Sequence, residues 1–361
     1  MSNSKSNSKS KSEAERFQLS LFKRLFIASF HGDLKLVKES ISAGADVNRG
    51  RPEDGATPLI AASSYGHLAV VRLFVESNAN INIATNDGTT ALYIASKNGH
   101  LEIVRFLVKS NADINMACNE GYTPLIIASI NGYIQIVRFL VQSNADINFS
   151  DNYGYTALAI ASALGQLDVV RFLVSSNADI NTGNNVGATA LMIASHNGHL
   201  EIVRCLVTSN ADINMTGDNG NTSLMAACSG GHLEIVNLLL RNNAEVNEIT
   251  EYDYTPLHCA SEAGHVDILM TLIDAKANLF LKNSSGNTPL DVATTDEIRQ
   301  YIINNPWYRR RKLIVMRPHN DHLSNKKHRM TSLGWLVTAK EKGDGEDVEL
   351  FHLKREVASF L

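Results

Sequence analysis

The sequence predicts an all-helical repeat solenoid, in which short similar repeats stack around one continuous core. Three observations lead to this prediction. One pattern of residues recurs every 33 positions over most of the 361-residue chain. Within each period, apolar residues lie at helical spacing, with glycine or asparagine between the helical stretches. Each stretch is too short to bury its apolar face alone, so neighbouring repeats must supply the core.

The composition is that of a folded chain without a membrane span. With 44% apolar and 19% charged residues, the chain is too apolar to be disordered. No window of about 18 uncharged apolar residues could cross a bilayer, and the first residues lack the apolar segment of a secretion signal. The 4 cysteines form no Cys-x-x-Cys pair, which indicates reduced thiols. We therefore expect a cytoplasmic protein, with the nucleus as the alternative.

Two series of glycines keep the 33-residue period. The first series opens a Gly-x-Thr triplet, and Asp253 takes the glycine place in one repeat. Its members are Gly55, Gly88, Gly121, Gly154, Gly187, Gly220 and Gly286. The second series separates two helical stretches and comprises Gly66, Gly99, Gly132, Gly165, Gly198, Gly231 and Gly264. Because both series hold one phase over seven periods, chance does not account for them.

Residues 86–118 show how one repeat is built. Thr90 is a good N-cap for a first helix, which ends at Asn98-Gly99. A second helix is predicted over 101–109, where apolar residues share one face. Asn111 follows at a place that needs a left-handed backbone, which asparagine tolerates best after glycine. An extended stretch then leads to the polar turn with the Gly-x-Thr triplet, which we call the finger.

These motifs resemble those of the ankyrin repeat family. Thr-Pro-Leu begins at Thr57, Thr123, Thr255 and Thr288, and Gly-His-Leu begins at Gly66, Gly99, Gly198 and Gly231. Ala112-Asp113-Ile114-Asn115 and near variants close almost every repeat. The resemblance covers residues 21–305 and implies about nine repeats, caps included. It also implies a non-enzymatic scaffold or adaptor that binds proteins on the concave face formed by the fingers and first helices.

The sequence departs from the family pattern at two places in the repeat. The family usually has glycine after the second helix, whereas this chain keeps Gly44, then has asparagine in six repeats, and ends with Lys276. We expect Lys276 to fit this turn least well, because its Cβ opposes a left-handed backbone. The histidine that ends Thr-Pro-Leu-His is kept only at His258, so we expect its hydrogen bonds to be lost elsewhere, including at Asp291.

Charge and composition divide the chain into three regions. Residues 1–19 are rich in serine, lysine and asparagine and are predicted to be disordered, residues 20–305 form the repeat array, and residues 306–361 form a basic and apolar segment. The formal charge is −11 over residues 21–305 and +5 over residues 306–361. We therefore expect a monomeric array and a protein partner of basic character.

No catalytic, cofactor or metal site is predicted. The sequence lacks the phosphate-loop, dinucleotide, zinc-protease and nucleophile-elbow motifs. One histidine recurs per repeat, about 10 Å from the next along the stack, which is too far to share a metal. These histidines are His67, His100, His199, His232 and His265. Second-helix arginines recur at Arg72, Arg105, Arg138, Arg171 and Arg204. Because several have an acidic residue three positions earlier, we expect a self-neutralised solvent face rather than a phosphate-binding stripe.

The candidate binding residues are apolar or aromatic side chains at finger tips and first-helix ends. Such side chains lose hydration free energy unless a partner covers them, and tyrosine is a common interface anchor. The candidates are Tyr65, Tyr122, Ile130, Tyr153, Tyr155, Leu164, Val186, Tyr252 and Tyr254. We expect Tyr122, Tyr153 and Tyr155 to form a central anchor cluster. The alternative is an ordinary surface with scattered tyrosines.

The segment after Asn305 leaves the 33-residue period and carries two basic clusters. They comprise Arg309, Arg310, Arg311, Lys312, Lys326, Lys327 and Arg329. Apolar residues accompany them, including a strand-like run over 313–316, so we expect the segment to dock on the last repeats or on a partner. The alternatives are nuclear import, nucleic-acid contact and membrane-surface binding, and the second functional class is a nuclear or nucleic-acid-associated regulatory factor. The final Ser359-Phe360-Leu361 fits a peptide for PDZ-type strand addition.

Overall fold

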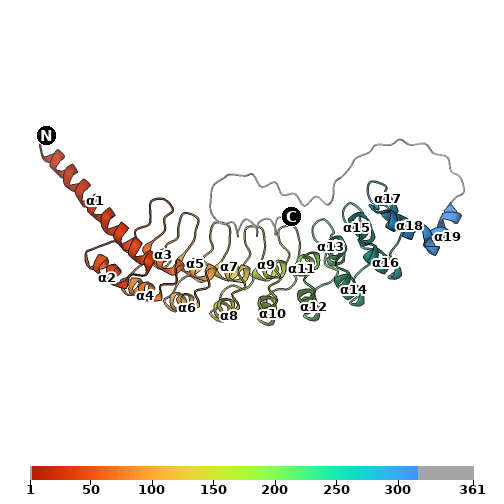
Figure 1. The fold of residues 1–361 in the computed structure, drawn as a ribbon, viewed down its shortest axis with the longest axis horizontal. Coiled ribbons are helices and arrows are strands. Elements are labelled where there is room, and N and C mark those ends of the chain that lie inside the picture. The colour runs from red at the N-terminus through yellow and green to blue at the C-terminus, as the bar shows by residue number, and fades with distance from the viewer. Residues whose placement is uncertain (1, 316–361) are drawn as a thin grey trace. The chain divides into compact units, whose positions relative to one another are not determined.

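The computed structural model describes the backbone of residues 2–315 and the side chains of residues 14–310. In that part of the chain it contains 19 α-helices, two isolated β-bridges and no longer strands (Figure 1). The predicted all-helical repeat fold is confirmed. The chain divides into two compact units: unit 1 is residues 1–190 with 201–212, and unit 2 is residues 191–200 with those from 213 onward.

The first eighteen helices alternate along the chain between a first and a second helix of each repeat, and one more helix follows the array. In order they are α1 (Ser2–His31), α2 (Leu34–Ser42), α3 (Pro58–Ser64), α4 (Leu68–Glu76), α5 (Ala91–Lys97), α6 (Leu101–Lys109), α7 (Pro124–Ile130), α8 (Ile134–Gln142), α9 (Ala157–Ala163), α10 (Leu167–Ser175), α11 (Ala190–His196), α12 (Leu200–Thr208), α13 (Ser223–Gly230), α14 (Leu233–Arg241), α15 (Pro256–Ala263), α16 (Val266–Asp274), α17 (Pro289–Val292), α18 (Asp296–Asn304) and α19 (Pro306–Val315). The second helix predicted over 101–109 has those bounds in α6.

Threonine caps start the first helices, as predicted. In α5, the Thr90 hydroxyl oxygen accepts a hydrogen bond from the Tyr93 backbone N–H at 3.1 Å. Thr57 and Thr123 make the same bond and are followed by proline, which has no N–H to satisfy in the first turn. These local interactions fix where each first helix begins.

Residues with a left-handed backbone end the second helices, also as predicted. Asn78, Asn111, Asn144, Asn177, Asn210 and Asn243 have φ between 59° and 66°. Lys276 occupies the same place with φ 72°, so a lysine with a Cβ adopts the backbone that the family gives to glycine. Asp253 replaces a finger glycine at φ 58°. Both kinds of turn therefore keep their left-handed backbone when another residue stands in the place of glycine.

Each unit buries its core between successive repeats. In unit 1, α3 packs on α5, α5 on α7, and α7 on α9, while the second helices contact one another in a parallel row (Figure 1). A typical second helix buries three apolar side chains, which in α6 are Ile103, Val104 and Leu107. In unit 2, α13 packs on α15 and α15 on α17. The repeats therefore share their cores with neighbours in each unit.

Histidines before the second helices tie neighbouring repeats together. His67 Nε2 lies 2.9 Å from the Phe30 carbonyl oxygen, and His100 Nε2 lies 3.0 Å from that of Ser64. In unit 2, His232 Nε2 lies 2.7 Å from the His196 carbonyl oxygen. Each ring satisfies a carbonyl at the end of the preceding first helix. The structural role predicted for these three histidines is confirmed.

The structure corrects three expectations. Residues 2–19 were expected to be disordered but belong to α1, because the buried Leu21, Phe22 and Leu25 anchor this helix and an existing helix extends at low cost. The strand-like run is helical as far as Val315, in a helix that begins at Pro306. Asp291 retains the N-cap interaction, because its carboxylate accepts from the Thr288 backbone N–H at 2.8 Å.

Candidate functional site

The fingers of unit 1 form a rigid row of stacked turns, which we call the finger row. Within one finger, the Asp151 N–H donates to the Tyr155 carbonyl oxygen at 3.0 Å. Between fingers, the side-chain amide of Asn152 donates to the Asn119 carbonyl oxygen at 2.8 Å, and that of Asn185 donates to the Asn152 carbonyl oxygen at 2.9 Å. The backbone that carries the outward side chains of these turns is therefore held in place.

Two of the predicted tyrosines are exposed on the surface of unit 1. Tyr153 is 53% exposed at a finger tip, and Tyr65 is 51% exposed at the end of α3. The Tyr65 ring lies 4.1 Å from that of Phe30, measured between centroids. Tyr122 is half-buried on the finger that precedes the finger of Tyr153. Burial raises the pKa of its hydroxyl. The Tyr122 hydroxyl therefore stays protonated and can donate a hydrogen bond to a partner.

The prediction that two other candidates lie on the surface is wrong. Tyr155 is only 2% exposed and Ile130 only 5%. Tyr155 lies two positions after Tyr153, on the inner side of the finger, and burial raises its pKa to about 12. Ile130 is the last residue of α7 and packs into the first-helix layer. Leu164 and Val186 are half-buried. The predicted cluster of three tyrosines is thus reduced to Tyr122 and Tyr153.

The remaining candidates belong to unit 2. Tyr252 is 55% exposed, whereas Tyr254 is half-buried, with its ring 5.3 Å from that of His258. His258 is buried; its Nδ1 accepts from the Thr255 N–H at 3.2 Å, and its Nε2 lies 3.1 Å from the Asn287 carbonyl oxygen. Burial lowers the pKa of His258, which favours the neutral ring.

A buried carboxylate shapes the finger that carries Tyr153. Asp151 accepts hydrogen bonds from the backbone N–H groups of Tyr153 at 2.9 Å and Tyr155 at 2.8 Å. Burial raises the pKa of Asp151 despite these bonds. In the next finger, Asn184 accepts the equivalent pair of bonds, from Val186 at 3.1 Å and Ala188 at 2.9 Å, without a charge.

The second helices of unit 1 carry a ladder of arginine and phenylalanine side chains, which we call the helix-two face. The Arg72 guanidinium carbon lies 4.8 Å from the ring centroid of Phe106 in the next repeat. The corresponding distances are 5.3 Å for Arg105 over Phe139 and 4.6 Å for Arg138 over Phe172. Each is a cation–π contact between repeats. Two of the predicted self-neutralising pairs also form, Glu102 with Arg105 and Glu201 with Arg204.

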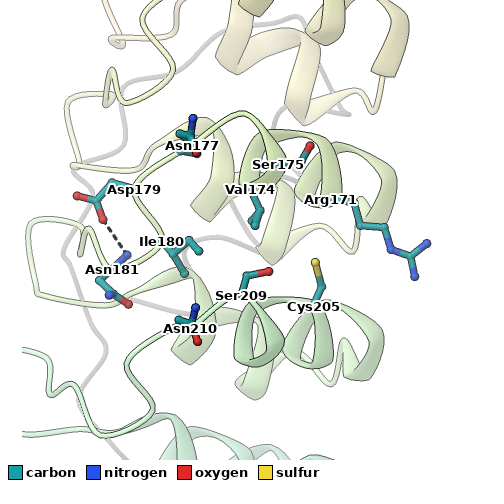
Figure 2. A pocket seen from close by; sticks show the side chains of 11 residues that line it. Arg171, Val174, Ser175, Asn177, Asp179, Ile180, Asn181, Cys205, Ser209 and Asn210 are labelled. Atoms are coloured by element: carbon teal, nitrogen blue, oxygen red, sulfur yellow. Dashed lines mark hydrogen bonds between the residues drawn. The ribbon is translucent and has the colours of Figure 1, made fainter.

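A pocket of about 660 Å³ interrupts this ladder between α10 and α12 (Figure 2). Arg171 and Cys205 lie at one end, and Val174 and Ile180 line its middle. Cys205 occupies the position that holds a phenylalanine in the three preceding repeats. The pocket is therefore located where a ring is missing.

A second pocket, of about 950 Å³, lies within unit 2. Its lining includes Leu279, Phe280, Arg310 and the side chain of Trp307, which is 72% exposed. The rings of Phe280 and Tyr308 stack at 5.4 Å beside it. This apolar surface lies at the start of α19, where the predicted basic segment begins.

Only part of the basic segment can be placed. Arg309 and Arg310 are exposed on α19, and Arg309 donates to the carbonyl oxygen of Ile303 at 3.3 Å. Arg311 and Lys312 belong to the same helix. Lys326, Lys327, Arg329, the predicted docking of the segment and the final tripeptide lie outside the described residues.

Two of the cysteines, Cys228 and Cys259, are buried. Burial raises the pKa of Cys228, and it raises that of Cys259 to about 12, so both thiols stay protonated. Among the described residues, no group of three or more histidine, cysteine, aspartate or glutamate side chains could hold a metal ion.

Comparison with known families matches this repeat geometry. Models described as ankyrin repeats (3 copies) match residues 25–118, 110–184 and 178–250, and one described as ankyrin repeats (many copies) matches 243–293. These matches span well over half of the chain. The chain belongs to the ankyrin repeat family. No curated protein matches it. Ankyrin repeats generally mediate protein–protein interaction and are typically non-enzymatic.

Sequence analysis of this ankyrin repeat protein missed the phenylalanine ladder. The signal was present, because phenylalanine directly follows the recurring arginine at Phe106, Phe139 and Phe172 and is absent at Cys205. Among the described helices, none is both long and apolar enough to cross a membrane.

Proposed function

We propose that this ankyrin repeat protein is a non-enzymatic scaffold or adaptor that binds a protein partner on the finger row of unit 1. The observation that supports the proposal is Tyr153, which stands 53% exposed on a finger fixed by hydrogen bonds to both neighbouring fingers. A rigid, exposed tyrosine is a suitable anchor, because it buries a large area and loses little conformational entropy. Two further candidates are Tyr122, which lies on the preceding finger, and Tyr65, which lies at the end of α3.

The partner has basic character. Residues 21–305 carry a formal charge of −11, which attracts a positively charged surface over several ångströms. The association rate is therefore expected to fall as the salt concentration rises. The array acts as a monomer and offers Tyr252 and Tyr254 as a separate contact in unit 2.

Site-specific photo-crosslinking tests the proposal. A benzophenone amino acid at position 153 would capture the partner in cells, and calorimetry with both purified proteins would then measure the dissociation constant. We expect Tyr153→Ala to weaken binding by about 2 kcal/mol, near 30-fold, because a central aromatic anchor is lost. Tyr133→Ala is the matched control, because Tyr133 is also exposed in unit 1 but precedes α8 rather than lying on a finger.

Unchanged affinity in a variant that lacks both Tyr122 and Tyr153 would overturn the finger-row proposal. The second functional class, a nuclear or nucleic-acid-associated factor, stays a prediction, because most of the basic residues behind it lie outside the described residues. Loss of salt-sensitive DNA or RNA binding on deletion of residues 316–361 would favour that class.

A further inference from the structure

The arginine–phenylalanine pattern on the helix-two face of unit 1 stops at Arg171, and in the sequence it does not resume at Arg204, where the residue 34 positions later is Leu238. Three successive arginines, Arg72, Arg105 and Arg138, each lie over a phenylalanine ring that the next repeat supplies, at 4.6 to 5.3 Å. The rings come from residues 34 positions later in the chain. The next arginine in the series is Arg171, and the residue 34 positions after it is Cys205.

The replacement of a ring by a thiol leaves both space and an available cation. The pocket of about 660 Å³ opens between Arg171 and Cys205 and continues past Val174 and Ile180 (Figure 2). Arg171 is exposed, and among the residues with described side chains none forms an ion pair with it and no ring lies over it. Its guanidinium therefore retains an unused face.

The neighbouring groups suit an uncharged, flat ligand. Val174 and Ile180 supply apolar contacts, while Ser175, Ser209 and Asn210 form a polar rim, and the Asp179 carboxylate at the same rim disfavours an anion. The Cys205 thiol is half-buried, and this burial raises its pKa, so it stays neutral and does not compete for the positive charge of Arg171. A ring in this space would lie beside Arg171 as the three ladder phenylalanines lie beside the preceding arginines.

We propose that the space between Arg171 and Cys205 is a slot for one aromatic side chain of a protein partner, which stacks on Arg171 as the phenylalanines stack on the preceding arginines. The slot lies on the second helices rather than on the fingers. The slot is independent of the finger-row site, so an experiment can contradict either proposal without affecting the other. An aromatic side chain of a partner would complete the ladder.

Disulfide tethering at Cys205 tests the slot directly. The full-length protein is equilibrated with phenylethyl, indolylethyl and cyclohexylethyl disulfides under increasing 2-mercaptoethanol, and mass spectrometry measures the fraction of each cysteine that stays modified. We expect the aromatic groups to need about 5-fold more reductant for release from Cys205 than the cyclohexyl group of similar size, because only they gain a cation–π contact.

Arg171→Ala should abolish that preference at Cys205. Cys118, the other half-buried thiol of unit 1, is the internal control, and its preferences should be the same in both proteins. Phe172→Cys opens an equivalent slot under Arg138 and should create the same 5-fold aromatic preference at position 172. Equal release of phenylethyl and cyclohexylethyl groups from Cys205, or a preference that survives Arg171→Ala, would overturn the proposal.

A displayed library of random 12-residue peptides tests whether the slot binds an aromatic side chain of a polypeptide. Peptides are selected on the full-length protein and depleted on Cys205→Phe, in which the protein's own ring fills the slot. The proposal expects the surviving peptides to share a phenylalanine, tyrosine or tryptophan and to lose binding to Arg171→Ala. Survivors with no shared aromatic residue, or with full affinity for Arg171→Ala, would contradict it.

Discussion

The finger row and the helix-two face of unit 1 are built on the same 33-residue frame, yet they vary in opposite ways. In the fingers, the residues around the glycine change from repeat to repeat, and Tyr153 and Tyr155 in one finger lie on opposite sides of the turn. On the helix-two face, arginine over phenylalanine recurs three times and then stops at Arg171, where Cys205 stands in place of the ring. Variation is ordinary in the fingers, so exposure must identify the binding residues there. On the helix-two face, the departure itself is informative.

The largest expected effect separates the two sides of one finger. Tyr155→Ala should lower the free energy of unfolding by about 3 kcal/mol, because it removes a ring that is 2% exposed. Tyr153→Ala should change it by less than about 0.5 kcal/mol, because that ring is 53% exposed. Urea unfolding followed by circular dichroism measures both. Equal losses would mean that burial does not distinguish these tyrosines.

The ladder on the helix-two face should contribute measurably to stability. Phe139→Cys removes a half-buried ring and its contact with Arg105, and we expect a loss of about 2 kcal/mol. Cys205→Phe adds the missing ring and should gain about 1 kcal/mol. The same urea titration compares both variants with the natural chain. If Cys205→Phe were destabilising, a ring would not fit where the repeat places one.

The turn that follows each second helix belongs to the frame that the finger row and the helix-two face share, and its left-handed backbone can be tested by substitution. Asn144 has φ 65°, so Asn144→Gly should be neutral or stabilising, whereas Asn144→Val should cost roughly 1–2 kcal/mol. The comparison of the two variants isolates backbone strain, because both lack the asparagine side chain. Identical melting temperatures for the two would contradict the left-handed geometry.

The smallest expected effect concerns the charge inside the Tyr153 finger. Asp151→Asn should raise the melting temperature at pH 7 by about one or two degrees, because an amide accepts the same two hydrogen bonds without a buried charge. Asn184 already does so in the next finger.

The pH dependence of this effect has a definite sign. Burial raises the pKa of Asp151 above its ordinary value of 3.8, so the natural protein binds a proton more readily when folded than when unfolded. The destabilisation by Asp151 is full above the raised pKa and disappears as the pH falls through it. Melting curves from pH 7 to pH 4 should show the gap between the two proteins closing, and a gap that widens would exclude this origin.

The sequence by itself determined the helices and their turns in this ankyrin repeat protein. Thr90 and Asn111 act on neighbours a few residues away, so their caps and turns could be read from local chemistry. The period then extended one repeat to the others. The same reasoning predicted disorder for residues 2–19, because local composition does not include the buried anchor at Leu25 that α1 extends from.

Only the tertiary structure decided which side chains reach the surface and which meet across repeats. Tyr153 and Tyr155 are chemically identical and two residues apart, and only the packing of the finger buries one and exposes the other. The contact between Arg138 and Phe172 joins positions 34 residues apart, so it exists only once repeats stack. The open space at Cys205 has the same origin, because a missing ring leaves a pocket only where a neighbouring repeat forms its other wall.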